Sequence, residues 1–261
     1  MFSPLPFLPK VPPMTPEEFA ALSWQGLTAH IGPVSQVTPL FEALLKKTNC
    51  ALYMIYLGCV GLCHRRTASV FDQKLNLLLM EQIFAYQFDG RYPKTFGITI
   101  DDVDDTSDKA RAVRRSIAYF FFELLERAPG GFLSERPIMD IAYMIHLTRH
   151  LCGPPNAAAV DGWLRGLIQR LNEIAPSLVQ HSPFLYDYPD RESWAAATAE
   201  THGTPLPLEV LDLALDLSGL DLVARATEEL AGIDAAQNQL LVPPGALLAE
   251  GFDGRPYGRD R

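Results

Sequence analysis

Four carboxylates lie in a row at Asp101, Asp102, Asp104 and Asp105, interrupted only by Val103. Carboxylates at this spacing repel one another, so solvent, a helix N-terminus, a cation or a basic partner has to balance their charge. Mg²⁺ is a cation of the right kind, because it takes oxygen ligands. The cluster is therefore a candidate both for metal binding and for contact with a basic protein.

Asp101, Asp102 and Asp105 form a DDxxD pattern. This pattern resembles the first aspartate-rich motif of class I prenyl diphosphate synthases and terpene cyclases, which are all-α enzymes. The resemblance covers five residues and implies Mg²⁺ ions that hold a substrate diphosphate. A second metal-binding motif of that family is not evident in this sequence.

The acidic cluster could also have a capping or a docking role. We expect a helix to begin near Thr106, and carboxylates gather at helix N-termini because the dipole and the exposed amides favour negative charge there. The cluster could equally form a docking surface for a cationic partner. We favour capping or docking over metal binding.

Histidines offer a second possible metal site. His146 and His150 would lie one turn apart on a helix, which is ligand spacing, and His64 could join them from another helix. HExxH, ExxH and CxxC patterns are absent from the sequence, so the familiar zinc and di-iron sites are not indicated. The simpler interpretation is a polar helix face that borders solvent.

The segment from residue 184 to residue 194 combines aromatic, acidic and basic side chains. Tyr186, Tyr188, Arg191 and Trp194 are of the types that are enriched at protein interfaces. A loop pinned to the body by its aromatic side chains would have the same composition. The sequence leaves an interface and a pinned loop equally open.

The composition restricts the class of protein. The chain has 261 residues and a formal charge of −9, from 22 basic and 31 acidic side chains. Such a chain is poorly suited to nucleic acid and better suited to a basic partner. No export signal is recognisable and the longest apolar run, Cys50–Cys63, is too short to cross a membrane, so we expect a cytoplasmic protein with reduced cysteines.

Apolar residues recur at helical spacing along most of the chain, and no run of strands is indicated. The expected fold is an all-α single domain, either a multi-helix bundle or stacked helical hairpins, with eight or nine helices. The run Cys50–Cys63 is expected to be a buried core helix. The helices are expected at about 15–31, 37–62 with a break near Asn49, 70–88, 106–127, 136–151, 157–174, 190–200, 207–218 and 220–231, the last two forming a hairpin at Gly219.

The expected domain organisation has three parts. A proline-rich N-terminal arm covers residues 1–14 and either packs along the body or docks on a neighbour. The helical domain covers residues 15–242, with a possible soft boundary near 153–156. An irregular tail that lies over the surface or moves covers residues 243–261.

From these residues we expect an acidic, all-helical protein-interaction module with a basic protein partner. A toxin-neutralising protein of the immunity type or an assembly partner would have this character. The expected contact residues are Asp101, Asp102, Asp104, Asp105, Tyr186, Tyr188, Arg191 and Trp194, with no cofactor. The alternatives are a helical enzyme that binds Mg²⁺ and a diphosphate at Asp101, Asp102 and Asp105, and a helical metalloenzyme that uses His64, His146 and His150.

Overall fold

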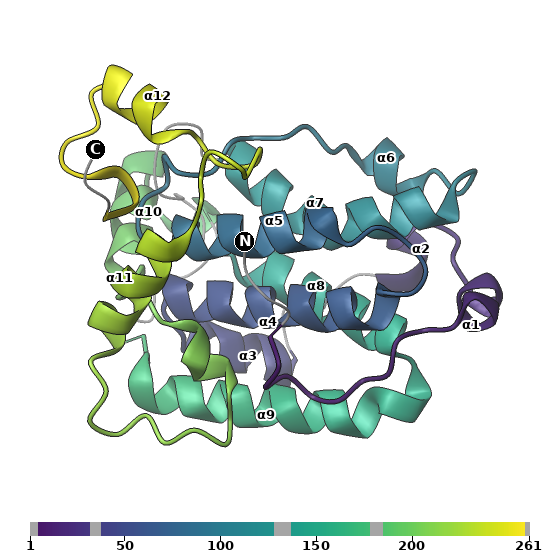
Figure 1. Cartoon of the computed structure of the whole chain (residues 1–261). Coiled ribbons are helices and arrows are strands. Elements are labelled where there is room, and N and C mark those ends of the chain that lie inside the picture. The colour runs from purple at the N-terminus through teal and green to yellow at the C-terminus, as the bar shows by residue number, and fades with distance from the viewer. Residues whose placement is uncertain (1–4, 32–37, 128–136, 178–184, 259–261) are drawn as a thin grey trace.

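All regular elements of the protein are helices, as the sequence predicts (Figure 1). The computed structural model describes residues 5–31, 38–127, 137–177 and 185–258. Within these ranges the only β-type pairings are two isolated bridges. None of the helices in these ranges combines the length and the apolar character that a membrane crossing requires.

Helix α4 (Asn49–Thr67) runs through the middle of the molecule and is buried on all sides. Every residue of this helix except Arg65 is buried. A helix without a polar face has to be covered by other elements all round. The expectation that Cys50–Cys63 forms a core helix is therefore confirmed, and the break expected near Asn49 is present because Thr48 caps the helix by accepting a hydrogen bond from the amide of Ala51.

Four long helices surround α4. They are α5 (Lys74–Tyr86), α7 (Lys109–Arg127), α8 (Ile138–Cys152) and α9 (Ala157–Ile174). In Figure 1, α5 lies above α4 and α9 lies below it. Helix α8 runs parallel to α4, because Cys63 lies beside Thr148 and Arg66 beside Leu151. Helix α5 runs antiparallel to α4, with Tyr53 beside Tyr86 and Gly61 beside Met80. Helix α9 is also antiparallel, with Gly58 beside Trp163 and Lys47 beside Asn172.

Shorter helices lie around this core. They are α1 (Pro16–Ala21), α2 (Leu27–Ile31), α3 (Pro39–Leu45), α6 (Ile100–Asp104), α10 (Arg191–Glu200), α11 (Leu222–Gly232) and α12 (Pro244–Ala249), with the 3₁₀ turns η1 (Pro154–Asn156), η2 (Leu185–Asp187), η3 (Leu208–Leu211) and η4 (Pro256–Gly258). Most of them begin or end where proline, glycine or a capping side chain interrupts the helical pattern.

The expected helix over 15–31 is divided into two short helices. Thr15 and Glu18 form the predicted capping box at the start of α1, with the side chain of each accepting a hydrogen bond from the backbone amide of the other. Gly26 then adopts a positive φ of 94°, which ends any continuous helix. A Cβ at this glycine would lie 2.8 Å from Oδ1 of Asp104, so the glycine also lets α6 approach closely.

The expected helix over 207–218 is wrong, and so is the hairpin at Gly219. This stretch contains only η3, followed by turns. The side chains of Asp212 and Asp216 each accept a hydrogen bond from the amide two residues further on. Such local bonds offer the backbone an alternative to the helix, which a periodic pattern of leucines does not reveal.

The tail is more ordered than the sequence suggests. Residues 243–258 include α12 and η4, and the side chain of Tyr257 is completely buried. Its ring stacks on Tyr92 at 4.2 Å between centroids, and its hydroxyl donates to the carbonyl of Val242. The tail is therefore anchored in the body by an aromatic pair 165 residues apart in sequence.

The N-terminal arm packs along the body, which is one of the two placements expected for it. Leu5, Leu8 and Val11 are buried. Arg65 at the end of α4 donates hydrogen bonds to the carbonyls of Leu5 and Leu8, at 2.6 and 2.7 Å, and to that of Pro9. The guanidinium thus satisfies carbonyls of an extended segment that has no helical partners of its own.

A substitution at Gly58 tests the close packing of α9 on α4. A Cβ at this position would lie 2.5 Å from Cη2 of Trp163, so the Gly58→Ala substitution has to displace the indole ring. We expect it to lower the free energy of unfolding by about 1–3 kcal/mol in urea denaturation.

Gly162→Ala on α9 is the matched control, because nothing lies within 4 Å of its added Cβ. The gain in helix propensity is expected to stabilise this variant by about 0.5–1 kcal/mol. Equal effects of the two substitutions would show that α4 and α9 are not in close contact at Gly58.

Candidate functional site

The acidic cluster forms its own short helix, α6, instead of preceding the helix expected from Thr106. Thr99 caps α6, and the carboxylate of Asp102 accepts hydrogen bonds from the backbone amide and hydroxyl of Thr99, both at 3.0 Å. The other oxygen of Asp102 forms an ion pair with Arg115 of α7. Capping, which we favoured, thus accounts for Asp102, although at a different helix from the one expected.

The other carboxylates of the cluster differ in their partners. Asp104 accepts hydrogen bonds from the hydroxyl and the amide of Thr28, at 2.9 and 3.3 Å, and so ties α6 to α2. Asp105 accepts the amide of Ser107 and pairs with Arg111 at 2.9 Å. The hydrogen bonds from Ser107 and the nearby guanidinium lower the pKa of Asp105. Asp101 is exposed.

The charge of the cluster is balanced within the same part of the chain. Residues 101–115 contain five aspartates and four basic side chains, so the local net charge is only −1. Of the three aspartates of the DDxxD pattern, Asp102 binds Thr99 and Arg115, Asp105 binds Ser107 and Arg111, and Asp101 is exposed. Across the parts of the chain that the structure describes, no three His, Cys, Asp or Glu side chains are arranged to hold a metal ion, so the geometry gives no support to a magnesium site.

The three candidate histidines lie in different surroundings. His64 is buried, and its Nδ1 has no hydrogen-bond partner among the described residues. His146 is half-buried, and Nε2 of His150 lies 3.1 Å from the carbonyl oxygen of Ser23. Burial, with the charge of a neighbouring arginine, lowers the pKa of His64 and of His146. The histidine metal site likewise has no support in the described geometry.

The aromatic segment divides into an exposed and a buried part. Tyr186 is 76% exposed and Arg191 is exposed, whereas Trp194 is only 4% exposed. Tyr188 is half-buried. Trp194 anchors α10 and is covered by the protein itself, so the partner contacts expected of this segment could involve Tyr186 and Arg191 but not the indole ring.

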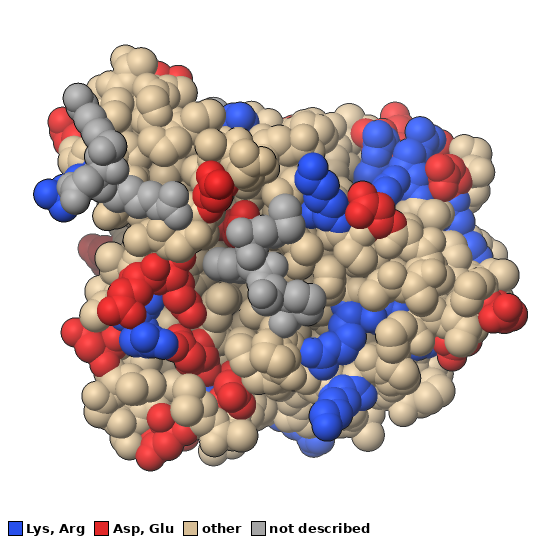
Figure 2. Space-filling model, viewed as in Figure 1, with Lys and Arg blue, Asp and Glu red and all other residues tan. Residues whose placement is uncertain are grey.

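The sequence-based predictions missed a second acidic region, residues 208–232, which we call the 208–232 segment. It carries a net charge of −5 of the −9 of the whole chain, from Glu209, Asp212, Asp216, Asp221, Glu228, Glu229 and the single basic residue Arg225. Figure 2 shows acidic side chains gathered over α11 and the loop that precedes it. A count of charge along the sequence would have found this region.

The 208–232 segment also exposes large apolar side chains. Leu215, Leu220 and Val223 are 37%, 40% and 45% exposed. They alternate in sequence with the carboxylates of Asp216 and Asp221. Apolar side chains that stay accessible beside unbalanced charge are a common feature of surfaces that contact another molecule.

Arg170 of α9 holds the first part of this segment in place. Its guanidinium donates to four backbone carbonyls, with distances between 2.5 and 3.4 Å; these belong to Val210, Asp212, Leu213 and Leu215. The side chain of Leu213 packs over Gly166, where a Cβ would lie 2.7 Å from it. The turns after η3 are therefore fixed by side chains of α9.

Two glutamates meet at the base of the 208–232 segment. Glu229 accepts the amide of Leu208 at 2.8 Å, and Glu209 pairs with Arg225 through its Oε1 atom. Oε2 of Glu209 is buried without a hydrogen-bond partner among the described residues. Burial, and then the charge of Glu209, raise the pKa of Glu229 to about 7. A proton on Glu229 lets this carboxyl group donate to Glu209, which two ionised carboxylates could not do.

A cysteine and a histidine that the sequence did not connect also meet. Sγ of Cys50 lies 3.5 Å from Nε2 of His202, a residue 152 positions away, and that nitrogen also lies 3.0 Å from the carbonyl oxygen of Gln87. Burial raises the pKa of the Cys50 thiol well above its usual range, and the side chain has no exposure. A nucleophile needs an accessible thiolate, so this pair has a packing role.

The substitution Arg170→Met tests how the 208–232 segment is held. It removes the donor of four carbonyls, and we expect a loss of about 2 kcal/mol or more in the free energy of unfolding. Amide hydrogen exchange should accelerate in residues 208–223. Arg165→Met on the same helix removes a hydrogen bond to the carbonyl of Asp161 and should change stability by less than about 0.5 kcal/mol.

The substitution Glu229→Gln tests whether a proton on Glu229 joins this carboxyl group to Glu209. A carboxyl whose folded pKa is raised from 4.5 to about 7 stabilises the fold fully below pH 4.5, and this contribution is lost as the pH rises through 7. The glutamine amide donates to Glu209 at every pH, so the variant should be more stable than the wild type above pH 7 by about 1 kcal/mol, discounted for solvent screening. The advantage should disappear toward pH 4.5.

The measurement is chemical denaturation of both proteins between pH 4.5 and pH 8. Glu173→Gln, which replaces an exposed glutamate of α9, is the matched control and should leave the pH dependence of stability as in the wild type. A parallel pH dependence of the wild type and Glu229→Gln would contradict the shared proton.

Comparison of the chain with protein-family models, with curated protein sequences and with solved structures found no match. The function proposed for the chain therefore rests on its own charges, contacts and exposed side chains.

Proposed function

We propose that this chain is a protein-interaction module that binds a basic protein segment at the 208–232 segment. The observation that carries the proposal is the concentration of charge: these residues hold a formal net charge of −5 in a chain whose formal total is −9. Of the aspartates at residues 101–105, which suggested docking in the sequence, Asp102 and Asp105 pair with arginines of α7, and Asp104 bonds to Thr28. The docking surface is therefore assigned to the 208–232 segment.

The exposed apolar side chains indicate how a partner would be held. Electrostatic attraction steers a basic partner to an acidic surface and selects against acidic ones, but affinity depends on apolar burial near the centre of the contact. Leu215, Leu220 and Val223 offer that apolar surface between carboxylates. The fitting partner is a segment with lysine or arginine on either side of apolar residues, such as a basic amphipathic helix.

The fixed backbone of the segment also favours binding. Arg170 holds the carbonyls of residues 210–215, and Asp221 caps α11 through the amide of Ala224 at 3.0 Å. A surface that is ordered before binding loses less conformational entropy when the partner arrives. A toxin-neutralising protein of the immunity type and an assembly partner would both use a surface of this kind.

The triple substitution Asp212→Asn, Asp216→Asn and Asp221→Asn tests the proposal. Asparagine keeps an oxygen that accepts the same backbone amides, so the variant loses charge without losing its turns and cap. The probe is a short amphipathic peptide of leucine and lysine, titrated by calorimetry. We expect at least about tenfold weaker binding to the variant, which is about 1.4 kcal/mol.

The control is Asp72→Asn, Asp190→Asn and Asp253→Asn, which removes the same charge from exposed aspartates elsewhere. Two of these also accept backbone amides, as the tested aspartates do. An equal loss in the control would mean that bulk charge alone attracts the peptide. Equal binding of a peptide with glutamate in place of lysine would also overturn the proposal.

A further inference from the structure

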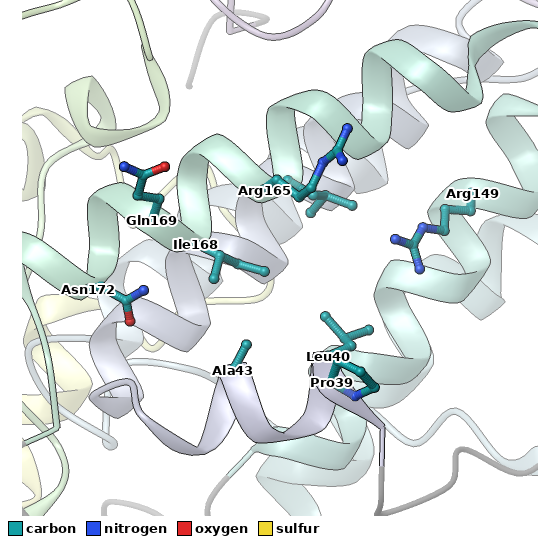
Figure 3. A pocket seen from close by; sticks show the side chains of 9 residues that line it. Pro39, Leu40, Ala43, Arg149, Arg165, Ile168, Gln169 and Asn172 are labelled. Carbon is teal, nitrogen blue, oxygen red and sulfur yellow. The ribbon is translucent and has the colours of Figure 1, made fainter.

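A separate cavity of about 330 Å³ opens between α3, α8 and α9 (Figure 3). Its volume falls within the range of small-molecule sites. The apolar part of its lining consists of Pro39, Leu40, Ala43, Leu164 and Ile168. Figure 3 shows that the side chains from α3 and α9 face one another across this space, with Arg149 reaching toward it from α8.

The polar groups of the cavity are basic or amide side chains. They are Arg149, Arg165, Gln169 and Asn172, and none of the nine described residues that line the cavity is acidic. Arg149 donates from its Nε to Asp161 at 2.7 Å, and Arg165 lies exposed one turn further along α9. Asp161 balances Arg149, so Arg165 is the arginine of the lining that adds positive charge in excess.

A buried lysine orients one of these polar groups. Nζ of Lys47 donates to the carbonyl of Ala43 and to Oδ1 of Asn172, both of which belong to residues that line the cavity. An ammonium group can only donate, so the Oδ1 atom of Asn172 faces Lys47 and its Nδ2 donor points away from the lysine. Burial lowers the pKa of Lys47 to about 8, which leaves it charged at neutral pH.

We propose that this cavity binds a small carboxylic acid with an apolar body. The carboxylate meets the terminal nitrogens of Arg149, because its Nε atom is already bonded to Asp161. The apolar body lies against Leu40, Leu164 and Ile168. Arg165 and the charged Lys47 leave the surroundings of the cavity positive, which favours an anion over a neutral or cationic ligand. This activity is additional to partner binding at the 208–232 segment.

Titration of the full chain with octanoate tests the proposal, with binding followed by calorimetry. Octanol has the same apolar body without the charge, and octylamine has the opposite charge. We expect saturable one-to-one binding of octanoate, at least about tenfold tighter than that of octanol, and no binding of octylamine. Octanoate that binds no more tightly than octanol would overturn the assignment of Arg149.

Two variants test separately the charge of Arg149 and the volume of the cavity. Arg149→Gln should weaken octanoate at least about tenfold and leave octanol unchanged, and Ile168→Trp, which fills the cavity, should abolish the binding of both. Arg165→Gln should also weaken octanoate and provides a second test of charge in case Arg149→Gln fails to fold.

Arg191→Gln is the matched control, because it removes an exposed arginine from α10, which does not line the cavity. It should bind octanoate as the wild type does. Unchanged octanoate binding by Ile168→Trp would show that the ligand lies outside the cavity and would overturn the proposal.

Discussion

The burial of α4 on all sides is the constraint on which the rest of the structure depends. A helix with no polar face can be stable in water only when other elements cover it completely. Four long helices do so, and the carbonyls of Thr201 and His202 accept the amides of Asn49 and Cys50 at its N-terminus. Gly58 and Gly61 let Trp163 and the N-terminal arm approach the helix closely.

Helix α9 links the core to both proposed sites. One part of its surface packs on α4 and supports the 208–232 segment through Gly166 and Arg170. Another part lines the cavity with Leu164 and Ile168. Sites on a helix that the core fixes are held more precisely than sites on loops. The two proposals therefore share one rigid support while they use different side chains and different ligands.

Two acidic stretches that look alike in sequence have opposite electrostatic surroundings. The aspartates at residues 101–105 are followed by four basic residues in the next ten, and Arg111 and Arg115 turn back onto them. The 208–232 segment has Arg225 alone. The sequence showed that the first cluster needs a balancing group, and counting neighbouring charges would have suggested that α7 supplies it. The pairing itself required the geometry of α6 against α7.

The sequence by itself determined the helical class, the core helix at Cys50–Cys63, the break before it and the bounds of α9, because these depend on apolar spacing and on caps within a few residues. Only the tertiary structure decided the turns after η3, the burial of Tyr257, the proximity of Cys50 to His202 and the cavity beside Lys47. The last three depend on contacts between residues far apart in the chain, which local spacing cannot encode. The turns after η3 combine the local bonds of Asp212 and Asp216 with bonds from Arg170 of α9.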